Sequence, residues 1–249
     1  MILKKLKTAV IASLLGAAVM ASSATAGNVA VPEEMREMFR AWLLSEPEII
    51  PEAMAVLEER QNAERAAALS GMIAQNRALI FDDGLPAYGA TDGDAVTIVK
   101  FSDYRCGFCA RAHQELSSVL EGRSDVRILV REFPVLGPES TSLAEFALAV
   151  QSLAGDAAWK RVHDAIFEGG GGWSPQRAQA LAEAEGLSFE EVAGVMSSAE
   201  VAEEIAMTQQ IARALNVTGT PTFIIGTTLV PGAVPADRLT ALIDAELDR

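Results

Sequence analysis

The chain has 249 residues, a formal net charge of −14 and only two cysteines. A chain this acidic repels nucleic acid and anionic lipid, and we therefore expect no nucleic-acid partner. The negative charge itself favours solubility. Two cysteines also exclude a small disulfide-rich scaffold, and a chain of this length buries a sizeable core without such bridges.

The first residues have the pattern of a secretory signal. Lysines at positions 4, 5 and 7 precede an apolar stretch over residues 8–20, which is too short to span a bilayer. Residues 24–26, Ala-Thr-Ala, fit a small-x-small cleavage site. We therefore predict a signal peptide over residues 1–26 that is cleaved on export; a retained membrane anchor is the alternative.

Residues 27–82 predict an N-terminal helical arm. Apolar side chains recur at spacings of three and four residues along its first helix: Met35, Met38, Phe39, Trp42 and Leu43. Ser45 and Glu48 have the spacing of a capping box that would start a second helix. An isolated arm cannot bury these side chains in itself, so it either docks on its own domain or associates with copies of itself. We predict a homo-oligomer formed through residues 31–80.

Residues 83–249 predict an α/β domain. After a turn at Asp92-Gly93, a strand over residues 95–101, a helix over 110–120 and a second strand over 126–133 form a right-handed βαβ unit with parallel strands. A helical insertion follows at about residues 139–216. A β-hairpin with Gly226 at its turn and a final helix over residues 236–247 complete the predicted domain.

Both cysteines lie in the motif CGFC, Cys106 to Cys109, between the first strand and the following helix. A purely structural disulfide does not suit this spacing. A disulfide that closes a four-residue loop stabilises the fold by only about 2 kcal/mol, against about 4.7 kcal/mol for one that closes a 100-residue loop. A zinc site needs two more ligands, for which His113 and His163 are the only histidines.

A redox pair explains the motif better. A cysteine at a helix N-terminus lies beside unpaired N–H groups and the positive end of the helix dipole, and both favour thiolate over thiol. We therefore assign Cys106 as the nucleophile and Cys109, one turn later and more buried, as the resolving thiol. Gly107 and Phe108 between them tune the reduction potential and access. This chemistry needs no cofactor and no metal.

The CGFC motif after VTIVKFSDY, the helical block and GTPTFIIG before the last helix together resemble the thioredoxin-fold DsbA superfamily over about residues 88–248. The stretch FRAWLLSEPEIIPEAMAVLEERQ resembles the N-terminal extension of the suppressor-of-copper-sensitivity protein C (ScsC) group, in which the arm can drive oligomerisation. The resemblance implies a thioredoxin fold with an inserted helical domain, preceded by a helical arm, in the Gram-negative periplasm.

The resemblance also implies a second element of the site. Pro221 is expected to be cis and to lie beside the cysteines, with the Thr220 backbone pairing with an extended substrate strand and its hydroxyl tuning Cys106. Relatives often carry an acidic residue where this chain has Lys100. Lys100 could pair with Glu132 or Asp103 or stabilise a negative sulfur, and the alternative for all three charges is an exposed strand end.

The predicted function is a periplasmic thiol-disulfide oxidoreductase that acts on cysteines and disulfides of client proteins and exchanges electrons with a membrane redox partner. We favour a disulfide isomerase or reductase, because several sites held by an oligomerising arm suit an isomerase. The Gly-x-Cys order also resembles known isomerases more than the Cys-Pro-His-Cys of strong oxidases. The alternatives are a dithiol oxidase and a copper-handling or thiol-chaperone protein that binds Cu(I) at Cys106 and Cys109.

Overall fold

The computed structural model describes residues 31–91 and 95–249, so the predicted signal peptide and the Asp92-Gly93 turn lie outside the described residues. The chain divides into two compact units, Met1–Val56 and Leu57–Arg249. Among the described helices none is long and apolar enough to cross a membrane.

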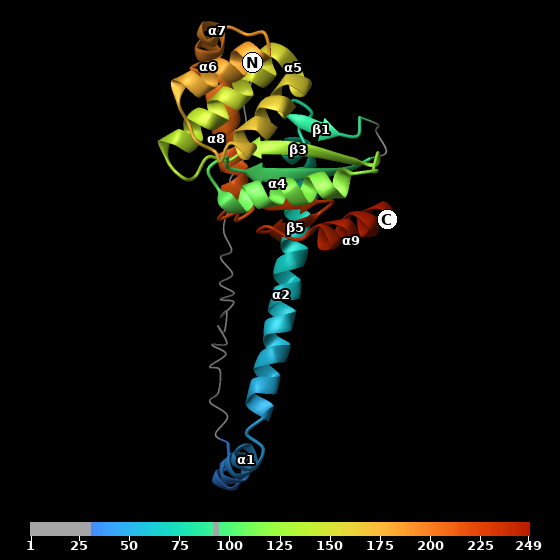
Figure 1. Ribbon diagram of the computed structural model, residues 1–249. Coiled ribbons are helices and arrows are strands. Elements are labelled where there is room, and N and C mark those ends of the chain that lie inside the picture. The colour runs from blue at the N-terminus through green and yellow to red at the C-terminus, as the bar shows by residue number, and fades with distance from the viewer. Residues whose placement is uncertain (1–30, 92–94) are drawn as a thin grey trace, which may run out of the picture. The chain divides into compact units, whose positions relative to one another are not determined.

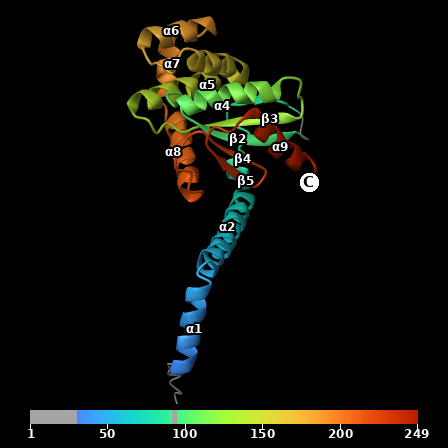
Figure 2. The same cartoon turned by 60° about the horizontal axis from the view of Figure 1, so that its bottom comes forward.

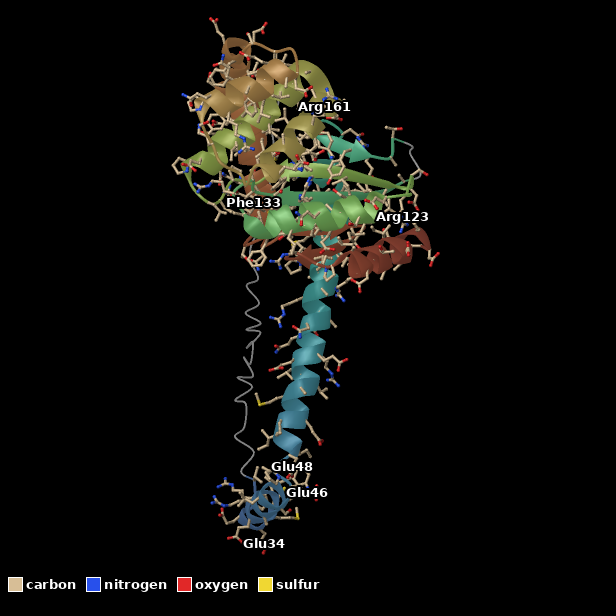
Figure 3. The ribbon with its side chains drawn as sticks, viewed as in Figure 1. Glu34, Glu46, Glu48, Arg123, Phe133 and Arg161 are labelled. Atoms are coloured by element: carbon tan, nitrogen blue, oxygen red, sulfur yellow. The ribbon has the colours of Figure 1, made fainter. Side chains whose placement is uncertain are left out.

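The first unit is helical, as predicted for the arm. Helix α1 spans Glu33–Ser45 and helix α2, Ile49–Gln75, begins in this unit. The expected capping box is wrong, because the Ser45 hydroxyl donates to the Trp42 carbonyl at the end of α1 and α2 starts after Glu48. No residue of α1 is buried, and its side chains project freely around the helix near Glu34, Glu46 and Glu48 (Figure 3).

The second unit is built on a five-stranded sheet in the order β1-β3-β2-β4-β5 (Figure 1). The strands are β1 (Ala87–Gly89), β2 (Val96–Ser102), β3 (Val126–Glu132), β4 (Thr222–Ile225) and β5 (Thr228–Pro231). Strands β2 and β3 are parallel and joined by α4 (Gly107–Leu120), which confirms the βαβ unit. The other pairings are antiparallel, and β1 was not predicted because a three-residue strand has no recognisable period.

The helical insertion lies between β3 and β4, where the sequence placed it. It comprises α5 (Pro138–Glu168), α6 (Pro175–Ala184), α7 (Phe189–Met196) and α8 (Ala199–Ala214), and α9 (Ala236–Leu247) follows the hairpin (Figure 2). Gly155, with φ of 77°, kinks α5 into two helical segments. Ser188 and Glu191 form a capping box at the start of α7.

Alternation along β2 and β3 divides the core between the two faces of the sheet. Ile98, Ile128 and Val130 face the core beneath α4, α5 and α9. Val99 and Leu129 face the opposite core, which also contains Ile73 of α2 and Ile80 of α3 (Arg77–Ile80). The end of the predicted arm therefore packs into the second unit.

The same alternation fixes where the charged strand residues point. Because side chains at even positions share a face, Lys100 and Glu132 lie on the α4 and α5 side of the sheet. Arg131 lies on the other side, where it donates to the carbonyls of Leu79 and Ile80 and pairs with Glu204. The sheet thus carries a lysine and a glutamate into the core below the CGFC helix.

Candidate active site

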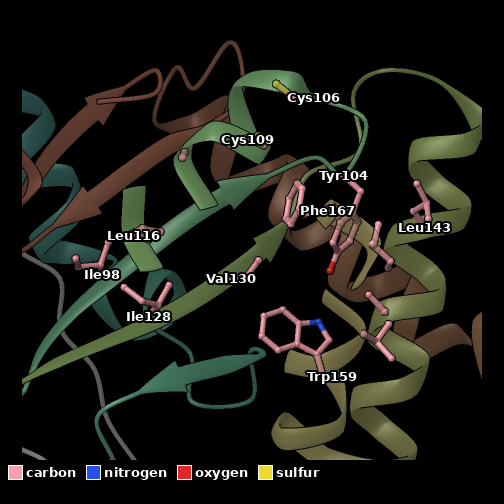
Figure 4. Close-up of a cluster of buried hydrophobic side chains, with 14 of the residues drawn as sticks. Ile98, Tyr104, Cys106, Cys109, Leu116, Ile128, Val130, Leu143, Trp159 and Phe167 are labelled. Atoms are coloured by element: carbon pink, nitrogen blue, oxygen red, sulfur yellow. The ribbon is translucent and has the colours of Figure 1, made fainter. Parts of the chain in front are cut away.

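The two cysteines lie at the N-terminus of α4, as predicted. Cys106 is the N-cap residue, and its carbonyl accepts from the amides of Cys109 and Ala110. Both are free thiols; Cys106 is 8% exposed and Cys109 is fully buried, on the next turn of the helix (Figure 4). Phe108 between them is 60% exposed. Of the two cysteines, Cys106 is therefore the one that keeps some contact with solvent.

The loop before β4 lies against Cys106. The Thr220–Pro221 peptide bond is cis, as the resemblance implies. The Cys106 thiol donates to the Thr220 carbonyl oxygen over 3.3 Å, so the contact that joins the two segments is made by the Thr220 backbone. A segment 114 positions away in sequence thus meets the reactive end of α4.

Asp103 organises the turn that leads into the motif. Its carboxylate accepts from the amides of Arg105, Val135 and Leu136 and from the Ser140 hydroxyl, at 2.8–3.1 Å. Its own amide donates to the Cys109 sulfur over 3.5 Å. These bonds satisfy the buried carboxylate without a cation, so Asp103 ties the cysteine turn to the loop after β3 and does not pair with Lys100.

Lys100 and Glu132 are fully buried below the cysteines, so the exposed strand end considered from the sequence is wrong. The Lys100 ammonium has no hydrogen-bond partner among the described residues and lies 5.0 Å from the centre of the Phe167 ring. Burial lowers the pKa of Lys100 to about 8, an effect that the charges of Cys109 and Glu132 oppose.

The acid–base properties of Glu132 and Cys109 are also set by burial. Burial raises the pKa of Glu132 to about 8 even though Tyr104 donates a hydrogen bond to it. Burial likewise raises the pKa of Cys109 to about 11, so this thiol keeps its proton at neutral pH. A step in which Cys109 acts as a nucleophile therefore needs a base, and the candidates are Lys100, whose pKa responds to the charges of both Cys109 and Glu132, and Glu132 itself.

Sequence reasoning missed a cluster of aromatic and histidine side chains that lies next to Glu132. The Tyr104 hydroxyl lies 2.8 Å from Glu132 Oε1 and 2.8 Å from His163 Nδ1. His113 of α4 stacks on Phe167 and lies 5.2 Å from the His163 ring, centre to centre. Figure 4 shows Tyr104 and Phe167 side by side between the cysteines and Trp159. No pattern in the sequence connects His163, in the insertion, with Tyr104.

The histidines do not complete a zinc site with the cysteines. Within residues 31–91 and 95–249 no three His, Cys, Asp or Glu side chains gather in a way that could hold a metal ion. His113 Nε2 lies 3.1 Å from Asp164 Oδ1, and the Asp164 carboxylate is also bound to Lys160. The two histidines therefore belong to a polar cluster under the sheet face.

The glycine run after α5 supports the cysteine turn. Helix α5 ends at Glu168, and Gly169 is its C-cap residue. Gly171 also packs its Cα against the Tyr104 carbonyl, because a Cβ there would lie 2.2 Å from that oxygen. The insertion thereby contacts the backbone two residues before Cys106.

Comparisons with known proteins agree with this geometry. The model of the DSBA-like thioredoxin domain matches residues 97–244, and that of the copper resistance protein ScsC N-terminal domain matches residues 33–64. No curated protein sequence matches the chain.

Solved structures extend the comparison. The thiol-disulfide exchange protein alpha-DsbA2 from Wolbachia pipientis is 25% identical, with a TM-score of 0.67 over 73% of this chain and 97% of its own. A thioredoxin-like oxidoreductase from Silicibacter pomeroyi is 32% identical, with a TM-score of 0.62 over 70% of this chain and 99% of its own. ScsC from Proteus mirabilis in a compact conformation has the same fold, at 24% identity and a TM-score of 0.63 over 87% of this chain and 98% of its own.

The family match covers more than half of the chain and includes the CGFC motif, the insertion and the cis-proline loop. The chain belongs to the DSBA-like thioredoxin domain family and is a thiol-disulfide oxidoreductase.

Proposed function

We propose that the protein is exported and works as a disulfide isomerase and reductase on client proteins, with Cys106 as the nucleophile and Cys109 as the resolving thiol. The observation that carries the assignment of roles is the difference in access: the Cys106 sulfur lies at the helix N-terminus beside Thr220, whereas Cys109 is enclosed. The lysine-rich, apolar N-terminus supports export.

The reaction begins when the Cys106 thiolate attacks a client disulfide. A Cys106–client disulfide forms and the first client sulfur leaves as a thiolate. In isomerisation another client thiolate attacks the client sulfur of this bond, which forms a new client disulfide and returns Cys106 as a thiolate. No net electrons are exchanged in that cycle.

In reduction the second sulfur of the protein completes the reaction. Cys109 loses its proton to Glu132 and attacks Cys106, which releases the second client thiolate and forms the Cys106–Cys109 disulfide. The client gains two electrons and the protein loses them, so a redox partner must reduce the pair again. Glu132 suits the role of acceptor, since burial makes it a stronger base than an exposed glutamate.

The arm supports the choice of isomerase over oxidase. In the first unit Met35, Met38, Phe39 and Trp42 are 41–60% exposed and lie on one side of α1. Apolar surface concentrated in this way marks an interaction site, and the match to the ScsC N-terminal domain covers the same residues. We propose that copies of this helix associate and hold several CGFC sites together.

Substitution in α1 tests this proposal, because deletion up to residue 80 would remove Ile73 and Ile80 from the core. Phe39→Asp should dissociate the oligomer and lower the recovery of scrambled ribonuclease, while reduction of a small disulfide stays normal. Leu44→Asp adds the same charge on the opposite side of α1 and serves as the control. If Phe39→Asp dissociates but keeps the isomerase activity of the wild type, association through α1 does not support isomerisation.

A further inference from the structure

Exposed apolar side chains lie next to Cys106, and the exchange chemistry does not use them. Phe108 is 60% exposed, and Val135 and Leu136 are 46% and 50% exposed. Asp103 joins the two segments, because its carboxylate accepts from the amides of Val135 and Leu136 and its carbonyl accepts from the Cys106 amide. Apolar side chains gathered on the surface in this way mark an interaction site.

Arg111 adds a positive charge to this surface. It is exposed and lies three residues after Phe108 on α4, and residues three apart are neighbours on the surface of a helix. The Arg111 Cζ atom lies 5.5 Å from the centre of the Phe108 ring. The guanidinium is therefore turned back toward the first turn of α4, where Cys106 caps the helix.

The charge of Arg111 is not balanced by a carboxylate in the described part of the chain. None of the ion pairs found there includes it. Arg105, the other cation next to the motif, pairs with Glu139 over 2.5 Å. Glu115, one turn beyond Arg111 on α4, accepts from the Ala236 amide instead. Arg111 is thus left with the Phe108 ring as its contact.

The position of this charge fits a negatively charged client. The whole chain carries a formal charge of −14, so a positive group beside the nucleophile has the opposite sign to the average surface and attracts an acidic segment toward the motif. A guanidinium also binds a carboxylate through two parallel N–H donors. A client with an acidic residue next to its cysteine therefore complements the charge as well as the apolar side chains around Cys106.

A cation in this place could instead act on the nucleophile itself. In that case it would favour the Cys106 thiolate and speed the attack on every disulfide by the same factor. The contacts favour recognition of the client, because the Cys106 thiol is bonded to the Thr220 carbonyl and the Arg111 guanidinium lies over an exposed ring. The two roles differ in whether the effect of Arg111 depends on the charge of the client.

We propose that Phe108, Arg111, Val135 and Leu136 form a client-binding surface next to Cys106, and that Arg111 selects client segments in which an acidic residue flanks the cysteine. The inference rests on the proposed attack of Cys106 on client disulfides. The apolar side chains contact a client of any charge, whereas Arg111 pairs with the carboxylate of an acidic one.

Three peptides test the selection. They differ only in the residues that flank a single cysteine, which are Glu, Gln or Lys, and each carries the same small neutral thiol in a disulfide. The full-length Cys109→Ser protein, in which an adduct lasts, is mixed with each peptide, and formation of the Cys106–peptide disulfide is timed by mass spectrometry. The ratio of the rates with the Glu and Gln peptides should fall about fivefold when Arg111→Gln is added, the scale of one exposed ion pair.

Comparing this ratio between protein variants removes two other effects. The intrinsic reactivity of each peptide is the same for every variant, and a change in the reactivity of Cys106 alters both rates equally. Arg111→Glu should reverse the selection and favour the Lys peptide over the Gln peptide. The ratio of the parent protein should also shrink at about 1 M salt, where the Debye length is about 3 Å.

Arg127→Gln is the control for net charge. It removes the same charge from β3, five residues before Glu132 and so about 16 Å from the end of the sheet that leads into the motif. The ratio should stay at the parent value in this variant.

Each result decides between the possibilities. An equal loss of rate with the Glu and Gln peptides in Arg111→Gln overturns the selection and assigns the charge to Cys106 itself. A fall of the ratio in Arg127→Gln as large as in Arg111→Gln also overturns it, since net charge alone would then explain the preference. If Cys106 forms no adduct with any of the three peptides, the proposed attack by Cys106 fails, and this inference fails with it.

Discussion

The contact between the glycine run and the cysteine turn provides a sharp test of how the insertion positions the site. Gly170 and Gly171 are adjacent and both adopt left-handed backbone conformations, with φ of 75° and 68°. An alanine at either position is strained by about 1–2 kcal/mol. Their surroundings differ, because a Cβ on Gly170 would meet no atom within 4 Å, whereas one on Gly171 would lie 2.2 Å from the Tyr104 carbonyl oxygen.

The expected displacement follows from these distances. Ordinary van der Waals contact begins at 3.4 Å, so in Gly171→Ala the two backbones must move apart by about 1 Å. The atoms that yield belong to Tyr104 and Arg105, immediately before Cys106. A misplacement of about 1 Å in a catalytic group can lower a rate by about 100-fold. We therefore expect Gly171→Ala to slow attack by Cys106 by about 10- to 100-fold.

Gly170→Ala is the matched control, because it adds the same methyl group and comparable backbone strain. Both variants should lose stability in thermal unfolding, and only Gly171→Ala should also react slowly with a small disulfide under native conditions. Equal rates of Cys106 attack in the two variants would show that the insertion does not position the cysteine turn.

Two further predictions follow from the buried charges. Burial raises the pKa of Glu132 above its unfolded value of 4.5 to about 8, so the folded protein binds the extra proton and loses stability as pH rises through this interval. Glu132→Gln should therefore gain stability relative to the wild type between pH 5 and 8, by an amount on the order of a few kcal/mol in urea unfolding; a constant difference would contradict the assignment. The lowered pKa of Lys100 changes the free energy of unfolding only above pH 8, where the stability that it contributes rises with pH. In β3, Arg131→Met should destabilise the protein by about 3 kcal/mol, because it removes a buried cation that holds two carbonyls and Glu204. Arg127→Met, which breaks an exposed pair with Asp83, should cost at most about 1 kcal/mol, and similar losses in both would refute the argument.

Much of the fold could be predicted because local patterns and packing agree. The last helix, the hairpin around Gly226 and the capping box of Ser188 are each specified by a few neighbouring residues. Ser45 shows the limit of such patterns: its hydroxyl is equally able to bond backward to Trp42, and the preceding helix uses it in that way.

The environment of the candidate site could be predicted only in part. The position of Cys106 at a helix start follows from the strand, the motif and the helix in succession. The burial of Lys100 depends on which face of β2 the insertion covers, and the strand sequence does not record this. The meeting of Tyr104 with His163 joins residues 59 positions apart, so only the packed structure reveals it.

The central claim is that Cys106 makes the first covalent bond with a client and Cys109 breaks it. The most direct measurement is to incubate Cys109→Ser and Cys106→Ser, each full-length and reduced, with a disulfide-linked peptide and to identify covalent adducts by mass spectrometry. The account predicts a lasting adduct at Cys106 in Cys109→Ser and almost none in Cys106→Ser. An adduct that forms as fast at Cys109 in Cys106→Ser, or the absence of any adduct in Cys109→Ser, would contradict it.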